Sequence, residues 1–238
     1  MLPLKILTQP DDETCGPTSL HAVYNYYGDE ITLEEVISEV SYLESGGTLA
    51  VMLAIHALKR GYRATIFTYN LHVFDPTWFY DTNVDIPEKL REQLQYKHEK
   101  KLHLATGAYL EFLNLGGHIC FEDLSANLLK RHFSKGIPIL TGLSATYLYQ
   151  CAREYVTPLN EVFYNDVKGH PSGHFVILAG YDDAKKYVVV ADPYAENLVS
   201  GDNYYSVKVG RLINSIMLGI LTYDANLLVI QPGKSETC

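Results

Sequence analysis

Apolar residues recur with helical spacing along the first quarter of the chain. A polar loop that begins at Gln9 leads into a predicted helix starting near Cys15, with Pro17 in the first turn, where its missing N–H needs no partner. Gly28 is a natural end for this helix. The spacing i, i+3, i+4, i+7 is followed by Leu20, Val23, Tyr24 and Tyr27. The pattern therefore places Cys15 at the N-terminal end of a helix.

Further helices and strands are expected up to about residue 142. Thr32 to Glu35 reads as a capping box, which predicts that a second helix begins there. A third helix is predicted over 48–60 because Gly61 is a typical stop, and alternation then predicts a strand over 62–69. The less regular middle predicts an aromatic loop over 74–80, helices over 87–100, 105–115 and 125–134, a buried strand over 118–121 and a strand over 137–142.

The last third of the chain is rich in predicted strands. Two apolar runs, 174–181 and 186–192, flank a short Asp-Asp-Ala-Lys turn and predict a β-hairpin. A helix is expected over 209–218 and a closing strand over 226–230. Helices come first and strands come later, which favours the α+β fold class.

Composition and charge narrow the class of protein. The 238 residues, 47% hydrophobic and 20% charged, are typical of a soluble globular chain that can bury a full core. The chain has 19 Lys+Arg and 28 Asp+Glu, a net charge of −9, which disfavours nucleic acid and membrane surfaces as partners. No signal peptide and no apolar run of about 18 residues is recognised, so we expect a cytoplasmic protein.

Four cysteines, at positions 15, 120, 151 and 238, are too few and too scattered for a disulfide scaffold, and no Cys-x-x-Cys pair indicates a zinc site. Cys120, Cys151 and Cys238 are therefore expected to be inert small hydrophobic residues. Cys15 differs because a helix N-terminus favours the thiolate through its unpaired N–H groups and its dipole. The same N–H groups can point at a developing oxyanion, and the side-chain amide of Gln9, six residues upstream, can supply a second donor.

A base and an orienting acceptor for Cys15 are found in the predicted hairpin. His174 opens the first apolar strand, where a polar ring is anomalous unless it faces a cleft. Asp192 ends the second strand, so antiparallel pairing brings His174 and Asp192 to the same end of the hairpin. That arrangement gives one imidazole nitrogen an acceptor and leaves the other nitrogen for a thiol.

The ordered set Gln9, Cys15-Gly-Pro, His174-Phe-Val and Asp192-Pro resembles the papain-like cysteine peptidases, and most closely the double-glycine leader peptidases that process bacteriocins, with their stand-alone relatives. The resemblance covers residues 5–60 and 172–195. It implies one papain-like domain over 1–238, in which a helical lobe (1–61) carries the nucleophile and a β-rich part (173–238) carries the histidine and the aspartate. The region 62–172 is then an insertion that supplies walls for the substrate.

The resemblance also implies roles for four residues. Cys15 would attack the acyl carbon, His174 would hold the thiolate and protonate the leaving amine, Asp192 would orient the imidazole, and Gln9 would stabilise the oxyanion. The expected function is a cysteine peptidase acting on a peptide or protein, with no cofactor and no metal. Since the chain carries no phosphate-binding loop and no membrane exporter, double-glycine specificity is not implied.

Two other functions remain open at this point. The same thioester could be resolved by an amine, which would make the protein a thiol acyltransferase, or the cleft could bind a peptide without cutting it. A zinc site formed by His170, His174, Asp182 and Asp183 is disfavoured, because no helix aligns the two histidines. The sequence predicts neither the identity of the substrate nor the oligomeric state.

Overall fold

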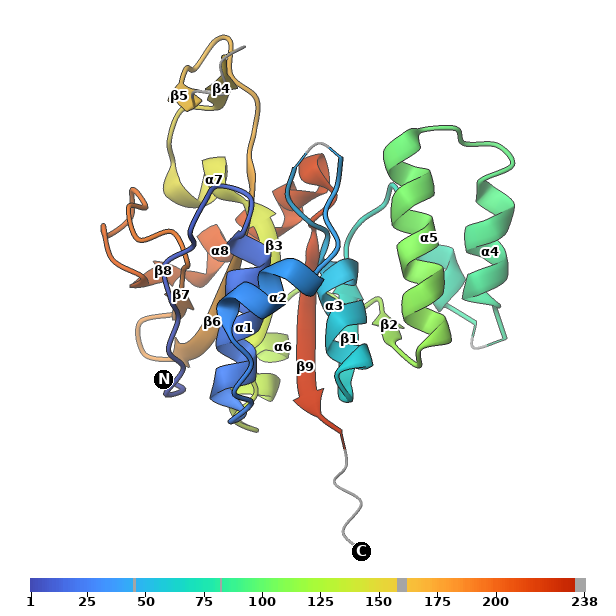
Figure 1. Ribbon diagram of the computed structural model, residues 1–238, viewed down its shortest axis with the longest axis horizontal. Helices are drawn as coiled ribbons and strands as arrows, with labels where there is room; N and C mark the ends of the chain where they lie inside the picture. The colour runs from blue at the N-terminus through green and yellow to red at the C-terminus, as the bar shows by residue number, and fades with distance from the viewer. Residues whose placement is uncertain (45, 82, 158–161, 234–238) are drawn as a thin grey trace, which may run out of the picture.

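One seven-stranded sheet runs through the protein, in the order β2-β1-β9-β3-β6-β7-β8 (Figure 1). The computed structural model describes residues 1–44, 46–81, 83–157 and 162–233. All neighbouring strands of this sheet are antiparallel except β1 and β2, which are parallel. The strands are β1 (Tyr62–Thr68), β2 (His118–Cys120), β3 (Ile139–Ser144), β6 (Gly173–Asp182), β7 (Tyr187–Ala191), β8 (Tyr204–Lys208) and β9 (Asn226–Pro232).

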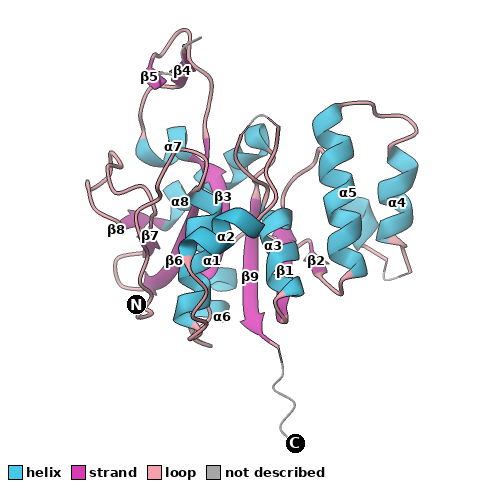
Figure 2. Ribbon diagram, in the orientation of Figure 1, coloured by secondary structure: helices cyan, strands magenta, loops and turns pink. Residues whose placement is uncertain are grey.

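Helices cover both faces of the sheet (Figure 2). The α-helices are α1 (Cys15–Tyr26), α2 (Leu33–Glu39), α3 (Ala50–Lys59), α4 (Ile86–Gln93), α5 (Lys100–Asn114), α6 (Ala126–Phe133), α7 (Ala145–Tyr149) and α8 (Val209–Leu218). Two 3₁₀ turns, η1 (Pro76–Phe79) and η2 (Gly219–Thr222), complete the helical elements. None of the helices in the described part of the chain has the length and apolar character needed to cross a membrane.

The sheet separates two hydrophobic cores, because successive side chains of a strand point to opposite faces. On β6, Phe175 and Ile177 belong to the core shared with α1, α3 and α5, whereas Val176 and Leu178 belong to the core shared with α6, α7 and α8. The result is a mixed helix-and-sheet fold of the α+β, papain-like kind that the sequence predicted.

Most of the predicted elements are confirmed, and the capping box at Thr32 is present, with Glu35 Oε2 accepting from the Thr32 N–H. The two predicted central helices are present with different bounds: α4 ends at Gln93 rather than near 100, and α5 begins at Lys100 rather than near 105. The predicted buried strand over 118–121 is an edge strand, and its His118 is exposed. Elements not predicted from the sequence are α7, β8, the 3₁₀ turns η1 and η2, and a separate two-stranded sheet formed by β4 (Glu154–Val156) and β5 (Val162–Tyr164).

The region 62–172 contributes to the sheet and also extends beyond it. Its strands β1 and β3 lie inside the seven-stranded sheet, on either side of β9. The helices α4 and α5 lie beyond the β2 edge, whereas the β4–β5 hairpin projects at the opposite end of the molecule, above α7 (Figure 1).

Candidate active site

Cys15 is the first residue of α1, and it is half-buried. The next residue must be small: a Cβ at Gly16 would lie 2.7 Å from Thr48 Cγ2 and 3.2 Å from Phe175 Cδ2. One turn later, the Ser19 hydroxyl donates to the Phe175 carbonyl oxygen at 3.3 Å. The start of α1 is therefore packed directly against the beginning of β6, the strand that carries His174.

The β6–β7 hairpin brings His174 and Asp192 into contact. Ile177 pairs with Ala191, and the register shifts between Leu178 and Gly180. The imidazole Nε2 of His174 lies 2.8 Å from Oδ1 of Asp192. His174 is 8% exposed and Asp192 is fully buried. The antiparallel pairing predicted from the sequence thus joins these two residues, with Nδ1 of His174 left free of Asp192.

Asp192 accepts three further hydrogen bonds. The hydroxyls of Tyr149 and Tyr205 donate to its Oδ2 at 2.9 and 2.6 Å, and the backbone N–H of Tyr194 donates to its Oδ1 at 2.9 Å. Burial opposes ionisation of Asp192, but His174 and these hydrogen bonds lower its pKa below the usual value. These tyrosine contacts were not predicted from the sequence. The alternation of residues in β8 could have indicated that Tyr205 points into the interior.

The charge environment of His174 favours the imidazolium. Burial alone lowers its pKa, but electrostatic interactions with Asp192 and Cys15, together with hydrogen bonds to both side chains, raise the pKa to about 10. Cys15, His174 and Asp192 are thereby electrostatically coupled. A pKa of about 10 favours the protonated ring at neutral pH.

This coupling predicts how stability depends on pH. Because the pKa of His174 is about 10 in the folded protein and near 6.5 in the unfolded chain, the stabilisation it provides is complete below pH 6.5 and is lost as pH rises through 10. We expect the difference in free energy of unfolding between the native protein and His174→Ala to shrink over this interval, as measured by urea denaturation at several pH values. The exposed His98→Asn serves as the control, and a difference independent of pH would contradict the coupling.

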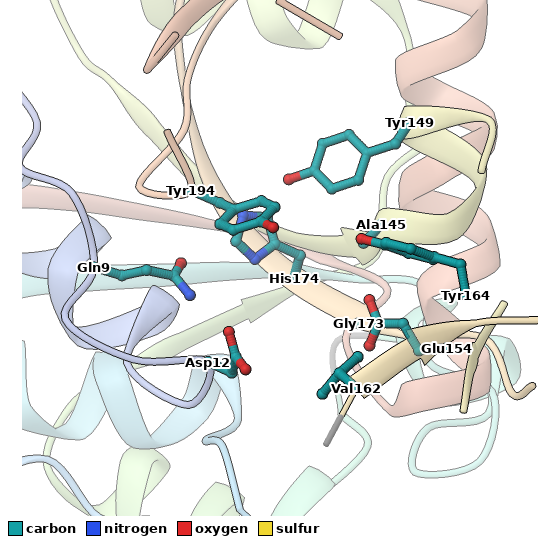
Figure 3. A pocket seen from close by; sticks show the side chains of 10 residues that line it. All are labelled: Gln9, Asp12, Ala145, Tyr149, Glu154, Val162, Tyr164, Gly173, His174 and Tyr194. Carbon is teal, nitrogen blue, oxygen red and sulfur yellow. The ribbon is translucent and has the colours of Figure 1, made fainter. Parts of the chain in front are cut away.

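Gln9 and His174 line the same pocket, and the side-chain amide of Gln9 is directed toward the histidine ring (Figure 3). Its backbone N–H donates to the carbonyl oxygen of Pro193 at 2.9 Å, which ties the Gln9 segment to the residue after Asp192. Its side-chain Nε2 donates to the Asp11 carbonyl oxygen at 2.8 Å, and this bond orients the amide. One N–H of the amide remains for another acceptor.

Two hollows meet at His174. The first, about 210 Å³, contains Gln9 and Tyr194 in its lining, and the second, about 170 Å³, contains Cys15, Thr48 and Asp224. His174 borders both. A substrate that lies across both hollows would therefore pass the thiol, the imidazole and the Gln9 amide in turn.

The remaining cysteines are separate from the group formed by Cys15, His174 and Asp192. Cys120 and Cys151 are free and half-buried, and burial raises the pKa of both thiols. Cys238 lies outside the described residues. Within the ranges that the structure describes, no three His, Cys, Asp or Glu side chains are grouped as metal ligands.

Helices and a largely antiparallel sheet that meet at a cysteine on a helix N-terminus and a histidine on a strand define the class of papain-like cysteine peptidases. Residues 1–211 match the sequence model described as the Peptidase_C39 like family, and the chain belongs to that family. It is accordingly a cysteine-type peptidase, a hydrolase. No curated protein is significantly similar to the chain.

Three solved structures illustrate the range of similar folds. A putative C39-like peptidase from Bacillus anthracis has 14% identity and a TM-score of 0.47, with 96% of this chain and 94% of that chain covered. A double glycine motif protease from an AMS/PCAT transporter, in complex with the leader peptide, has 14% identity, a TM-score of 0.45, and coverage of 97% and 93%. Xylellain, a cysteine protease from Xylella fastidiosa, has 16% identity, a TM-score of 0.43, and coverage of 98% and 85%.

Proposed function

We propose that the protein hydrolyses peptide bonds with Cys15 as nucleophile, His174 as general acid and base, and Asp192 as the orienting acceptor. The observation that carries this proposal is the His174–Asp192 contact of 2.8 Å, which leaves Nδ1 for the thiol of Cys15. The pKa of His174, raised to about 10, supports it, because the cation is favoured by the carboxylate and the sulfur together.

The first half of the reaction forms a thioester. The Cys15 thiolate attacks the carbonyl carbon of the scissile bond, and the carbonyl electrons move to the oxygen. The Gln9 Nε2–H and the backbone N–H of Cys15, which is unpaired at the helix start, donate to that oxyanion. When the carbonyl reforms, the C–N bond breaks and His174 transfers its proton to the leaving nitrogen.

The second half releases the acid product. A water molecule takes the place of the leaving amine and gives a proton to the now neutral His174 as its oxygen attacks the thioester carbon. The C–S bond then breaks, which returns the thiolate beside the imidazolium. Throughout both halves Asp192 holds the ring in one orientation, and the hydroxyls of Tyr149 and Tyr205 hold Asp192.

The substrate class proposed is a peptide or an extended segment of a protein, since two adjoining hollows share His174 in their linings. We also propose that the protein acts in the cytoplasm, which the free thiols of Cys15, Cys120 and Cys151 support.

Selective alkylation tests the proposed nucleophile. At mildly acidic pH, iodoacetamide is expected to modify Cys15 roughly tenfold or more faster than the other cysteines, because a thiolate–imidazolium pair stays nucleophilic where ordinary thiols are protonated. His174→Ala should remove this advantage. Peptide mapping by mass spectrometry measures the rates, and equal labelling of all cysteines in the native protein would refute the assignment.

A further inference from the structure

The hollow that contains Gln9 also contains an unusual group of side chains, and we call it the tyrosine pocket. It is lined by Asp12, Tyr149, Glu154, Tyr164, His174 and Tyr194, among others. Figure 3 shows Asp12 and Glu154 facing the same space from different elements, the loop before α1 and the strand β4. The pocket therefore forms where the N-terminal loop, the β4–β5 hairpin and His174 meet.

The charged groups at this pocket are two carboxylates and His174, whose pKa of about 10 favours the cation and whose charge is opposed by Asp192 at 2.8 Å. Among the described residues, no lysine or arginine lines it, whereas Asp12 and Glu154 both do. Glu154 is fixed in place, because the Ser172 hydroxyl donates to its Oε1 at 2.8 Å and leaves Oε2 for another donor. The carboxylates also influence the tyrosines. Burial, followed by nearby groups that include Glu154 and Asp12, raises the pKa of Tyr164 to about 12. The same kinds of interaction raise the pKa of Tyr194.

The uncharged lining suits a cation as well. The rings of Tyr149 and Tyr194 lie 6.5 Å apart at 43°, and aromatic faces attract ammonium and guanidinium groups. The Oε1 atom of Gln9 is buried and has no hydrogen-bond partner in the described structure, so an acceptor remains unused at the wall. The volume of about 210 Å³ is smaller than the roughly 300–1,000 Å³ of small-molecule sites, which fits one side chain.

We propose that the tyrosine pocket binds a lysine or arginine side chain of the peptide substrate, with Asp12 and Glu154 as its counter-ions and the tyrosines as its walls. This inference rests on the proposed function, and it assigns that function a substrate class. The site thereby selects peptides with a basic residue near the scissile bond, and Asp12, in the loop before Cys15, contributes to this specificity.

Peptide binding to an inactive variant tests this inference without requiring turnover. Immobilised Cys15→Ala protein is incubated with a degenerate hexapeptide library with blocked ends, and the bound peptides are sequenced by mass spectrometry. We expect lysine and arginine to be enriched roughly tenfold over glutamine at one position, or about 1.4 kcal/mol, since a charge-assisted hydrogen bond is stronger than a neutral one. Adding Glu154→Gln, which keeps the acceptor for Ser172, should reduce the enrichment several-fold.

Matched variants separate a local effect from a general one. Asp12→Asn, in an exposed loop, should weaken the enrichment independently of Glu154, and the two changes together should abolish it. Glu88→Gln on α4 removes the same charge far from the pocket and should change nothing (Figure 1). The inference is overturned if basic residues are not enriched, or if the enrichment survives both substitutions. Failure of the alkylation experiment on Cys15 would instead refute the proposed function.

Discussion

Asp192→Ala is expected to lower the free energy of unfolding by roughly 3–5 kcal/mol, because it leaves a buried imidazolium without its counter-ion. The hydroxyls of Tyr149 and Tyr205 also lose their acceptor, and Asp192 itself is fully buried. Peptidase activity should fall by roughly 10³-fold or more, since the imidazole is no longer oriented. Urea denaturation measures the first effect, and kcat/KM on a cleaved peptide measures the second.

Three substitutions sharpen this prediction. Asp192→Asn keeps the shape and should cost less stability than alanine while still lowering kcat, because an amide cannot balance the imidazolium. Tyr149→Phe and Tyr205→Phe each remove one hydrogen bond and should cost about 1–2 kcal/mol with a smaller loss of activity. If Asp192→Ala is as stable as the native protein, the buried hydrogen bonds around this carboxylate do not contribute to the stability of the fold, which would contradict the prediction.

Gln9→Ala is expected to lower kcat by roughly 10²–10³-fold while KM changes little, because the amide would bind the oxyanion only after attack. Stability should stay within about 0.5 kcal/mol of the native protein, since the hydrogen bond from the side chain to the Asp11 carbonyl oxygen is local and exposed. Steady-state kinetics separates kcat from KM.

Gln9→Glu is the matched control for the hydrogen-bond donor. It preserves the length of the side chain but replaces the amide donor by a carboxylate that repels an oxyanion, so its activity should be at least as low as that of alanine. A rise in KM alone in either variant would assign Gln9 to substrate binding.

The local parts of the site could be predicted from the sequence. A helix that begins at Cys15 follows from Pro17 and the apolar spacing, and a hairpin that pairs 174–181 with 186–192 follows from alternation around a short turn. Both features depend on residues close together in the chain. For this reason the proximity of His174 to Asp192 follows from the amino-acid sequence alone.

The supporting shell could not be predicted in the same way. Tyr149 lies on α7, a five-residue helix too short for a periodic signal, and it reaches Asp192 across 43 positions of the chain. Glu154 lies on β4 of the β4–β5 sheet and lines the tyrosine pocket. No hydrophobic periodicity in this segment predicts that position. Contacts of this kind are set by tertiary packing, which residue spacing does not encode.

The position of β9 has a consequence for biosynthesis. This strand is made from residues 226–232, yet it lies between β1 and β3, so it supplies the pairing partner for both. During translation, β1 and β3 therefore emerge long before the strand that joins them, and His174 emerges more than fifty residues ahead of it. A chain that ends before β9 contains every residue of the proposed triad but lacks the strand that joins β1 to β3. The pairing of β9 with both β1 and β3 can therefore form only after nearly the whole chain has been made.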